Sequence, residues 1–472
     1  MNVLILGLWG ALALLYLARP RVAAAVYLLA LPAFPFYWAP LSVVPFNDIS
    51  IQQALAMGLA LGLALETLRQ TFDRRLAVGR LLLELAVAAL VVLWSLSAFD
   101  GRTFSGATRA MALALLDFWL PYALAVRIAW RPGGPRFLLG GLAWPALAVG
   151  ALALREYLAQ RPLAWEWFRA LASGPNDQVW APSLRAGGLR VQATLGQPIF
   201  LGFYLACAGV LGLALATSGP AFRRLLGCLA AATLLFLSLL PMARGAMLGM
   251  ALALLLLALL LRGRERQPLL VGALAGGVLL WLAAGLFASG ATFWGDFLLT
   301  LVGRAPGQVQ AEQLVNWEGR LEIVRVGLEL IGGAPLLGHG DVSVGGAWPL
   351  QDVANVFIGL GIASGPVGLA TFLLFLAGVG LQVLHLWRRE SRTANRAVAA
   401  GLVAALALAL TSWLDACWPG QFAQVAWVLL GLTGGWCTAP GASPSALETA
   451  PAKEDRAGSP PGVAAAAGSP VR

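Results

Sequence analysis

Two arginines stand at places where an apolar chain makes a charge costly. Arg190 lies in GLRVQATLGQPIFLGFYL, just before an apolar run, and Arg244 lies in LSLLPMARGAMLG, between two such runs. An arginine placed deep in a bilayer costs about 2.5–3.5 kcal/mol. Its planar guanidinium, however, donates two parallel hydrogen bonds to a phosphate. The pattern favours phosphate binding, and the alternative is an interfacial arginine whose charged end reaches water.

A third arginine, Arg320, lies in the longest polar interruption of the chain, from Ser289 to Gly368. The segment WEGRLEIVRVGLELI predicts an amphipathic helix with Glu318 and three other charged residues on one side. At helical spacing Arg320 falls about 200° from Glu318 and therefore lies on the apolar side. That side comprises Trp317, Leu321, Val324, Leu328 and Ile331. A helix lying on the membrane surface is the default interpretation, but it does not explain an arginine there.

Acid–base candidates occur in the same interruption. His339 and Asp341 lie in GHGD, which a plain turn explains equally well, and Asp352 precedes VAN, where it could instead cap the next helix. The sequence shows no Walker motif, dinucleotide fingerprint or metal-ligand cluster, and it has only 2 histidines. We therefore expect no metal and no other cofactor.

The composition indicates what positions these residues. The chain has 472 residues, of which 59% are hydrophobic and 11% charged, whereas soluble proteins have about 25% charged residues. Its apolar runs are long and rich in Leu and Ala, as helices of about 20 residues that span a bilayer require. A β-barrel would show short alternating segments instead. The sequence thus predicts an all-α polytopic membrane protein.

The apolar runs give about 12 to 13 transmembrane helices. The predicted spans are Asn2–Ala18, Val22–Trp38, Ile49–Leu68, Leu81–Phe99, Ala107–Val126, Phe137–Leu154, Pro198–Ala216, Leu225–Leu240, Ala243–Leu261, Leu269–Ala288, Asn355–Leu386, Ala397–Leu414 and Gln421–Trp436. Residues 1–437 form one integral membrane domain in this interpretation. Residues 438–472, rich in Ala, Pro, Gly and Ser, form a disordered tail.

The arginines cluster on alternate connections, and such loops face the cytoplasm. The basic connections carry Arg69/Arg74/Arg75/Arg80, Arg127/Arg131/Arg136, Arg223/Arg224, Arg262/Arg264/Arg266 and Arg388/Arg389/Arg392/Arg396. This topology explains the net charge of +10 without nucleic acid. It places the loops over about 155–197 and 289–354 outside the cell and the C-terminus in the cytoplasm. Arg190, Arg244 and Arg320 then share the outer face.

Three segments, taken in order, resemble the O-antigen ligase and O-antigen polymerase superfamily of bacterial membrane glycosyltransferases. They are RVQATLGQPIFLGFYL, LSLLPMARGAMLG, and the outer loop GRLEIVRVGLELIGGAPLLGHGD with the following AN-x9-G-x-x-G. The last motif contains Asn355, Gly365 and Gly368. The resemblance covers roughly residues 190 to 369.

The resemblance implies a GT-C-like helical fold in the bacterial cytoplasmic membrane and a metal-independent, inverting transfer. The donor would be a glycan on undecaprenyl diphosphate within the membrane lipid, and a chain-length regulator could be a partner. Arg190 and Arg244 would bind the diphosphate and stabilise it as leaving group, with Arg320 completing the set.

One position departs from the family pattern. Ligases of the family have a histidine before the motif asparagine, as the expected general base, and this chain has Ala354 there. A base must reach the acceptor hydroxyl, so Asp352, His339 or Glu318 would have to serve. The departure favours an exopolysaccharide or O-antigen polymerase, with an O-antigen ligase as the alternative. A lipid-linked glycan transporter is the other alternative, although charge is concentrated in the outer loops rather than at mid-bilayer.

Overall fold

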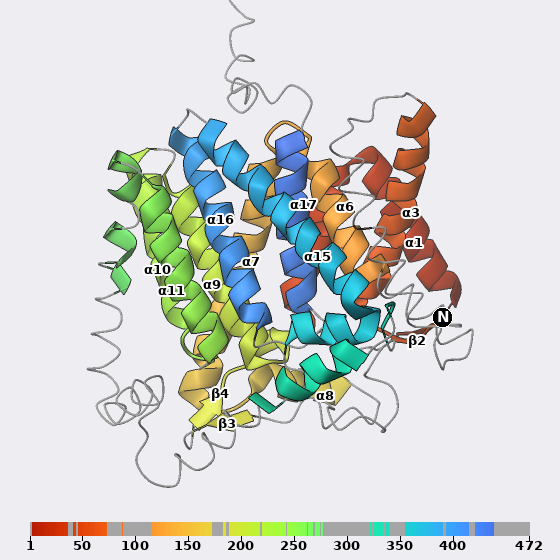
Figure 1. Cartoon of the computed structure of the whole chain (residues 1–472), viewed down its shortest axis with the longest axis horizontal. Helices are drawn as coiled ribbons and strands as arrows, with labels where there is room; N and C mark the ends of the chain where they lie inside the picture. Colours follow the sequence, from red (N-terminus) through yellow and green to blue (C-terminus); the bar gives the residue numbers. More distant parts are fainter. Residues whose placement is uncertain are drawn as a thin grey trace, which may run out of the picture.

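The structure, a computed structural model of the chain, is a bundle of helices that run up and down side by side (Figure 1). It describes residues 2–35, 41–43, 46–72, 87, 115–171, 183–185, 188–217, 220–241, 243–261, 263–267, 270–273, 275–276, 321–322, 324–333, 336–338, 355–389, 393–414 and 421–438. The predicted all-α polytopic membrane fold is confirmed.

The helices follow the predicted apolar runs closely. They are α1 (Asn2–Ala18), α2 (Pro20–Ala33), α3 (Ile51–Phe72), α6 (Leu120–Ala129), α7 (Gly134–Ala159), α8 (Leu163–Leu171), α9 (Pro198–Leu215), α10 (Ala221–Leu237), α11 (Arg244–Leu260), α15 (Val356–Arg389), α16 (Thr393–Trp413) and α17 (Gln421–Thr438). A π-helical turn, η1 (Leu115–Trp119), leads into α6, and two 3-10 turns are η3 (Ala193–Leu195) and η4 (Gly263–Arg266). A further helical segment covers residues 321–333.

Four of the described helices are long and apolar enough to cross a membrane. They are Gly134–Ala159, Pro198–Leu215, Val356–Arg388 and Asn395–Trp413. Shorter apolar helices cover most of the other predicted spans, whereas predicted spans Leu81–Phe99 and Leu269–Ala288 lie largely outside the described residues. The predicted span Asn355–Leu386 corresponds to α15, which Gly365 interrupts with non-helical backbone angles.

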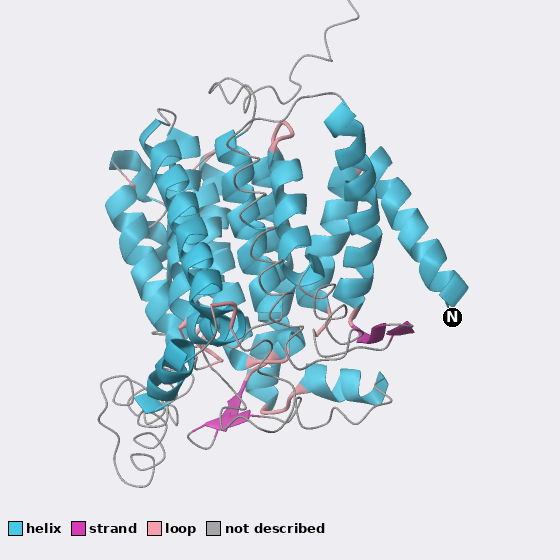
Figure 2. Cartoon of the chain, turned by 45° about the vertical axis from the view of Figure 1, so that its right-hand side comes forward, coloured by secondary structure: helices cyan, strands magenta, loops and turns pink. Residues whose placement is uncertain are grey.

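One end of the bundle collects the elements that are not vertical helices (Figures 1 and 2). These are the hairpin of β1 (Leu41–Val43) and β2 (Phe46–Ile49), the hairpin of β3 (Ser183–Arg185) and β4 (Gly188–Arg190), α8, and the helix over 321–333. We call it the hairpin end. The α6–α7 connection and the adjoining ends of α15 and α16 lie at the opposite end, as the alternation of arginine-rich and arginine-poor loops predicts.

Small residues let the helices approach one another. A side chain at Gly431 of α17 would overlap the Tyr122 carbonyl oxygen of α6, and a Cβ at Gly435 would lie 2.7 Å from the Val126 carbonyl oxygen. Van der Waals packing of this kind drives helix association where lipid removes the hydrophobic driving force. Beside this contact Phe375 stacks on Trp427, with ring centroids 5.5 Å apart.

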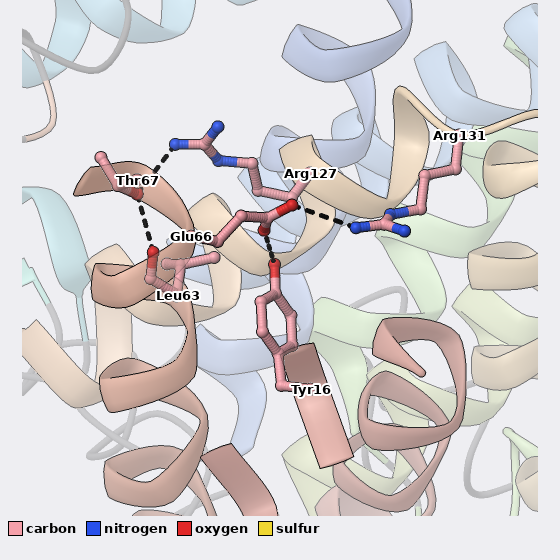
Figure 3. A network of polar contacts seen from close by, with 6 residues as sticks. All are labelled: Tyr16, Leu63, Glu66, Thr67, Arg127 and Arg131. Atoms are coloured by element: carbon pink, nitrogen blue, oxygen red, sulfur yellow. Dashed lines mark hydrogen bonds and ion pairs between the residues drawn. The ribbon is translucent and has the colours of Figure 1, made fainter. Parts of the chain in front are cut away.

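Several charged groups inside the bundle are paired with side chains of neighbouring elements. At the end opposite the hairpins, Tyr16 Oη donates to Glu66 Oε2 at 2.6 Å and Arg131 Nη2 donates to Glu66 Oε1 at 3.1 Å (Figure 3). Beside them Arg127 Nη2 donates to Thr67 Oγ1 at 2.9 Å. This network connects α1 and α3 to the end of α6 and the turn that follows it, and it satisfies groups that would be costly to bury alone.

A second paired group is Asp117, in the π-helical turn η1. Its carboxylate accepts from Gln424 Nε2 at 2.8 Å and from Gln53 Nε2 at 3.4 Å. These bonds connect η1 to α17 and α3 deep in the bundle, since Asp117, Gln424 and Gln53 are all buried.

The contact between α17 and α6 gives a stability prediction. Gly431→Val should lower the thermal stability of the detergent-solubilised protein, because a branched side chain must separate two helices and overpacking costs about 1–3 kcal/mol. The melting temperature from a thermal-shift assay checks this. The control is Gly380→Val on α15, where nothing lies within 4 Å. Equal melting temperatures for the two variants would contradict the packing role of Gly431.

Candidate functional site

The hairpin end is built around the point where α7 stops. Gln160 takes the left-handed conformation, with φ 49, and turns the chain toward α8. One turn earlier Glu156 is 1% exposed. Its Oε1 accepts from the Ala164 backbone N–H at 2.8 Å, and its Oε2 accepts from Ala193 N–H at 2.9 Å and Gln192 N–H at 3.4 Å. The end of α7 therefore holds both α8 and the segment after β4.

Arg190 is the last residue of β4, where it pairs with Ser183 of β3. Its half-buried side chain reaches the turn between α10 and α11, and Nε donates to the Pro241 carbonyl oxygen at 3.3 Å. Arg244 is the first residue of α11, three positions after Pro241. The structure thus brings Arg190 to the same turn that carries Arg244, as their common predicted face requires.

This turn is suited to an anion. The first N–H groups of α11 have no partner within the helix, and a helix N-terminus carries a partial positive charge. Ala243, before the helix, has extended backbone and makes no side-chain cap. Arg190 therefore adds a full positive charge beside a backbone site that already favours negative groups.

The helix over 321–333 lies against the first part of α15. Gly327 faces Ile358, and a Cβ at Gly361 would lie 2.6 Å from Ile331 Cδ1. The predicted apolar face is therefore only partly right, because Leu321 and Leu328 are 52% and 59% exposed. The packed face is centred on Gly327, since a glycine permits a closer approach than a leucine.

The charged face of this helix is confirmed. Arg325 Nη2 lies 2.6 Å from Glu322 Oε1 and Arg325 Nη1 lies 3.9 Å from Glu329 Oε1. The hydrogen bond from Arg325 lowers the pKa of the Glu322 carboxyl. All three side chains are exposed, so they form the water-facing side of the helix.

Gly338 of the outer loop contacts Gly365 of α15. Gly338 has φ +83 and Gly365 has φ +69 with ψ −175. The second conformation is essentially restricted to glycine. A Cβ on Gly365 would lie 2.5 Å from the Gly338 nitrogen, so the two backbones touch. Gly338, the first residue of GHGD, thus contacts the glycine motif of α15, which lies more than 20 residues later in the sequence.

The other motif residues have local roles in α15. Asn355 caps α15, because its Oδ1 accepts from Phe357 N–H at 3.0 Å and Ile358 N–H at 3.2 Å. A side chain at Gly368 would collide with Ser364, whose hydroxyl donates to the Leu360 carbonyl oxygen at 2.7 Å. The motif therefore starts the helix at Asn355, bends it at Gly365 and keeps the bend compact at Gly368.

Several predicted residues lie outside the described part of the chain. These are the candidate bases Asp352, His339 and Glu318 and the candidate phosphate ligand Arg320; of Arg244 only the backbone is described. Glu156 and Gln160 are functional candidates that sequence reasoning missed. The available signal was an acidic residue in ALALREYLAQRP, six residues before its proline.

The glycine contact can be tested directly. Gly365→Ala should raise hydrogen exchange over residues 356–364, because alanine in this conformation costs about 1–3 kcal/mol. Gly338→Ala should do the same, and the double variant should add little, since both changes break one contact. Gly378→Ala, with nothing within 4 Å, is the control. Additive effects of the two changes would show that the glycines act separately.

Two comparisons with known proteins were informative to different degrees: one gave no match and the other matched a protein family. A search of curated proteins finds no match to the chain. Residues 228–373 match the family model described as O-antigen ligase. The matched part runs from α10 to α15 and includes Arg244, Asn355 and Gly365, whereas Arg190 and Glu156 precede it. The match supports the resemblance to the O-antigen ligase superfamily, and it covers 146 of the 472 residues.

Proposed function

We propose that the hairpin end transfers a lipid-linked glycan from its diphosphate carrier to an acceptor hydroxyl. The family match supports an enzyme of O-antigen ligase-type surface polysaccharide assembly. The observation that carries the proposal is the position of Arg190, whose side chain lies on the turn that begins α11 with Arg244. Two arginines and a helix N-terminus at one place suit a diphosphate.

The proposed chemistry is a metal-independent, inverting displacement. The acceptor oxygen attacks the anomeric carbon of the donor, and the bond from that carbon to the diphosphate oxygen breaks. Negative charge grows on the leaving diphosphate, and cations already held in place lower the barrier because they need no reorganisation. Arg190 and Arg244 have this role in the proposal, and Arg320 supplies a third positive charge.

A general base must take the proton of the acceptor hydroxyl. Since Ala354 stands at the position of the family histidine, we propose that Asp352, His339 or Glu318 serves. The missing histidine favours a polymerase of O-antigen or exopolysaccharide over a ligase that attaches glycan to a lipid acceptor.

The donor in this proposal is a glycan on undecaprenyl diphosphate in the bacterial cytoplasmic membrane, and the hairpin end faces outward. Residues 1–437 would form the membrane domain and 438–472 a disordered tail ending in the cytoplasm. A chain-length regulator would be the protein partner of a polymerase.

A transporter of the same lipid-linked glycan is the second candidate. A transport path needs polar groups that face a central cavity. In the described part of the bundle two acids are engaged by neighbouring elements: half-buried Glu66 by Tyr16 and Arg131, and buried Asp117 by Gln424 and Gln53. Such fixed pairs favour a rigid scaffold beneath a surface site.

The arginine assignment predicts a specific loss. In a bacterial strain that lacks the gene, the Arg190→Ala protein should assemble surface glycan about 100-fold more slowly, the cost of removing one preset donor from a developing oxyanion. The measurement is glycan chain assembly at matched protein level in the membrane. Arg161→Ala is the control, because Arg161 is an exposed arginine at the same end, paired with Glu166 at 2.9 Å. Full assembly by Arg190→Ala would overturn the proposal.

The product separates polymerase from ligase. Purified protein supplied with lipid-linked glycan alone should lengthen the lipid-linked chain if it is a polymerase. A ligase should leave the chain length unchanged and transfer the glycan only when a second lipid acceptor is added. Gel separation of the lipid-linked products distinguishes the two results.

A further inference from the structure

The segment that carries Arg190 is held from both sides by the end of α7. On the N-terminal side Leu189 N–H donates to Gln160 Oε1 at 3.1 Å. On the C-terminal side Gln192 N–H and Ala193 N–H both donate to Glu156 Oε2, at 3.4 Å and 2.9 Å. Two side chains one helical turn apart thus fix three backbone groups within three residues of Arg190.

The hydrogen bonds to the Glu156 carboxylate are of the stronger, charge-assisted class. Its carboxylate is buried, and hydrogen bonds that involve a charged partner contribute about 1.5–3 kcal/mol each. Its second oxygen binds Ala164 N–H at 2.8 Å, so the same group also fixes the start of α8. Converging backbone N–H groups are a common way to hold an anion inside a protein.

The backbone of the held segment also needs an external restraint. Ala193 has φ +46, a left-handed conformation that alanine rarely adopts. Its N–H makes the shortest bond of the segment to Glu156. A residue kept in such a conformation persists only where its surroundings over-determine it, and the Glu156 carboxylate is part of that restraint.

We propose that Glu156, assisted by Gln160, is a positioning residue for Arg190. It fixes the backbone on either side of this arginine, so that the guanidinium is held at the turn beginning α11 before the donor binds. The proposal rests on the proposed role of Arg190 in diphosphate binding. It assigns no contact between Glu156 and the substrate.

The rival explanation is that Glu156 only stabilises the fold by holding α8. A double-mutant cycle distinguishes the two roles. If Glu156 acts through Arg190, substituting Glu156 should not weaken binding further once Arg190 has been replaced. Glu156→Gln keeps the size of the side chain but turns an amide N–H₂ toward a backbone N–H group. Glu166→Gln is the matched control, because it removes a partly exposed acid of α8 whose carboxylate accepts from Arg161.

The experiment measures binding of undecaprenyl diphosphate to the purified full-length protein in detergent, together with glycan transfer. Glu156→Gln should weaken binding about tenfold, which corresponds to the loss of about one buried hydrogen bond. In the Arg190→Ala background the same change should have no further effect. Glu166→Gln should bind as the unchanged protein does.

Each result decides between the ideas. An Arg190→Ala protein with normal binding and transfer would remove the proposed function itself. Weak binding by Arg190→Ala with unchanged binding by Glu156→Gln, or with additive losses in the double variant, would overturn the positioning role alone. If Glu156→Gln does not fold, Gln160→Ala replaces it, since Gln160 is exposed. Gln160→Ala should weaken binding of undecaprenyl diphosphate about two- to threefold. In the Arg190→Ala background this substitution should have no further effect.

Discussion

Close backbone approach at glycine is the constraint on which both the bundle and its hairpin end depend. Gly431 and Gly435 allow α17 to touch α6, and the same device attaches the outer loop to α15 through Gly338 and Gly365. Inside a membrane, apolar side chains gain little by leaving lipid for protein, so association depends on dispersion contacts and on how near the backbones can come. Gly338 therefore contacts the bundle through the same kind of close backbone approach that brings α17 against α6.

Three acids, half-buried Glu66 and buried Asp117 and Glu156, show a second level of organisation, because each has a different kind of hydrogen-bond partner. Glu66 is paired with a cation and a phenol, Asp117 with two amides, and Glu156 with backbone N–H groups. The first two connect helices to helices. The third connects a helix to an irregular segment, and it does so at the end that carries Arg190. A buried charge thus orders the irregular segment on which the proposed diphosphate site depends.

The sequence predicted the helices well because their signal is a long apolar run. The first helix has the predicted bounds, Asn2–Ala18, and α9 and α17 begin at the predicted Pro198 and Gln421. The common location of Arg190 and the turn before Arg244 was also predictable, since topology fixes which loops share a face. The hairpins were not predicted, because strands of three or four residues leave almost no pattern.

Two errors have physical causes. The apolar face of the 321–333 helix was predicted from large apolar residues such as the leucines, but the close contact is made by Gly327. Hydrophobic periodicity does not detect a glycine contact, because glycine has no side chain. Glu156 was missed because an acid near the end of an apolar run resembles an ordinary helix end. The role of Glu156 depends on hydrogen bonds from backbone N–H groups 8 to 37 positions later in the chain. Sequence spacing does not predict these contacts.

The bend at Gly365 has a mechanical consequence. The 24 residues from Pro366 to Arg389 continue as one helix, a rod of about 36 Å at 1.5 Å per residue. A rotation of about 5° at its base would move its far tip by about 3 Å on this length. Because the Gly338 backbone touches α15 at this bend, a displacement of Gly338 would be transmitted along the rod to the end of the bundle opposite the hairpins.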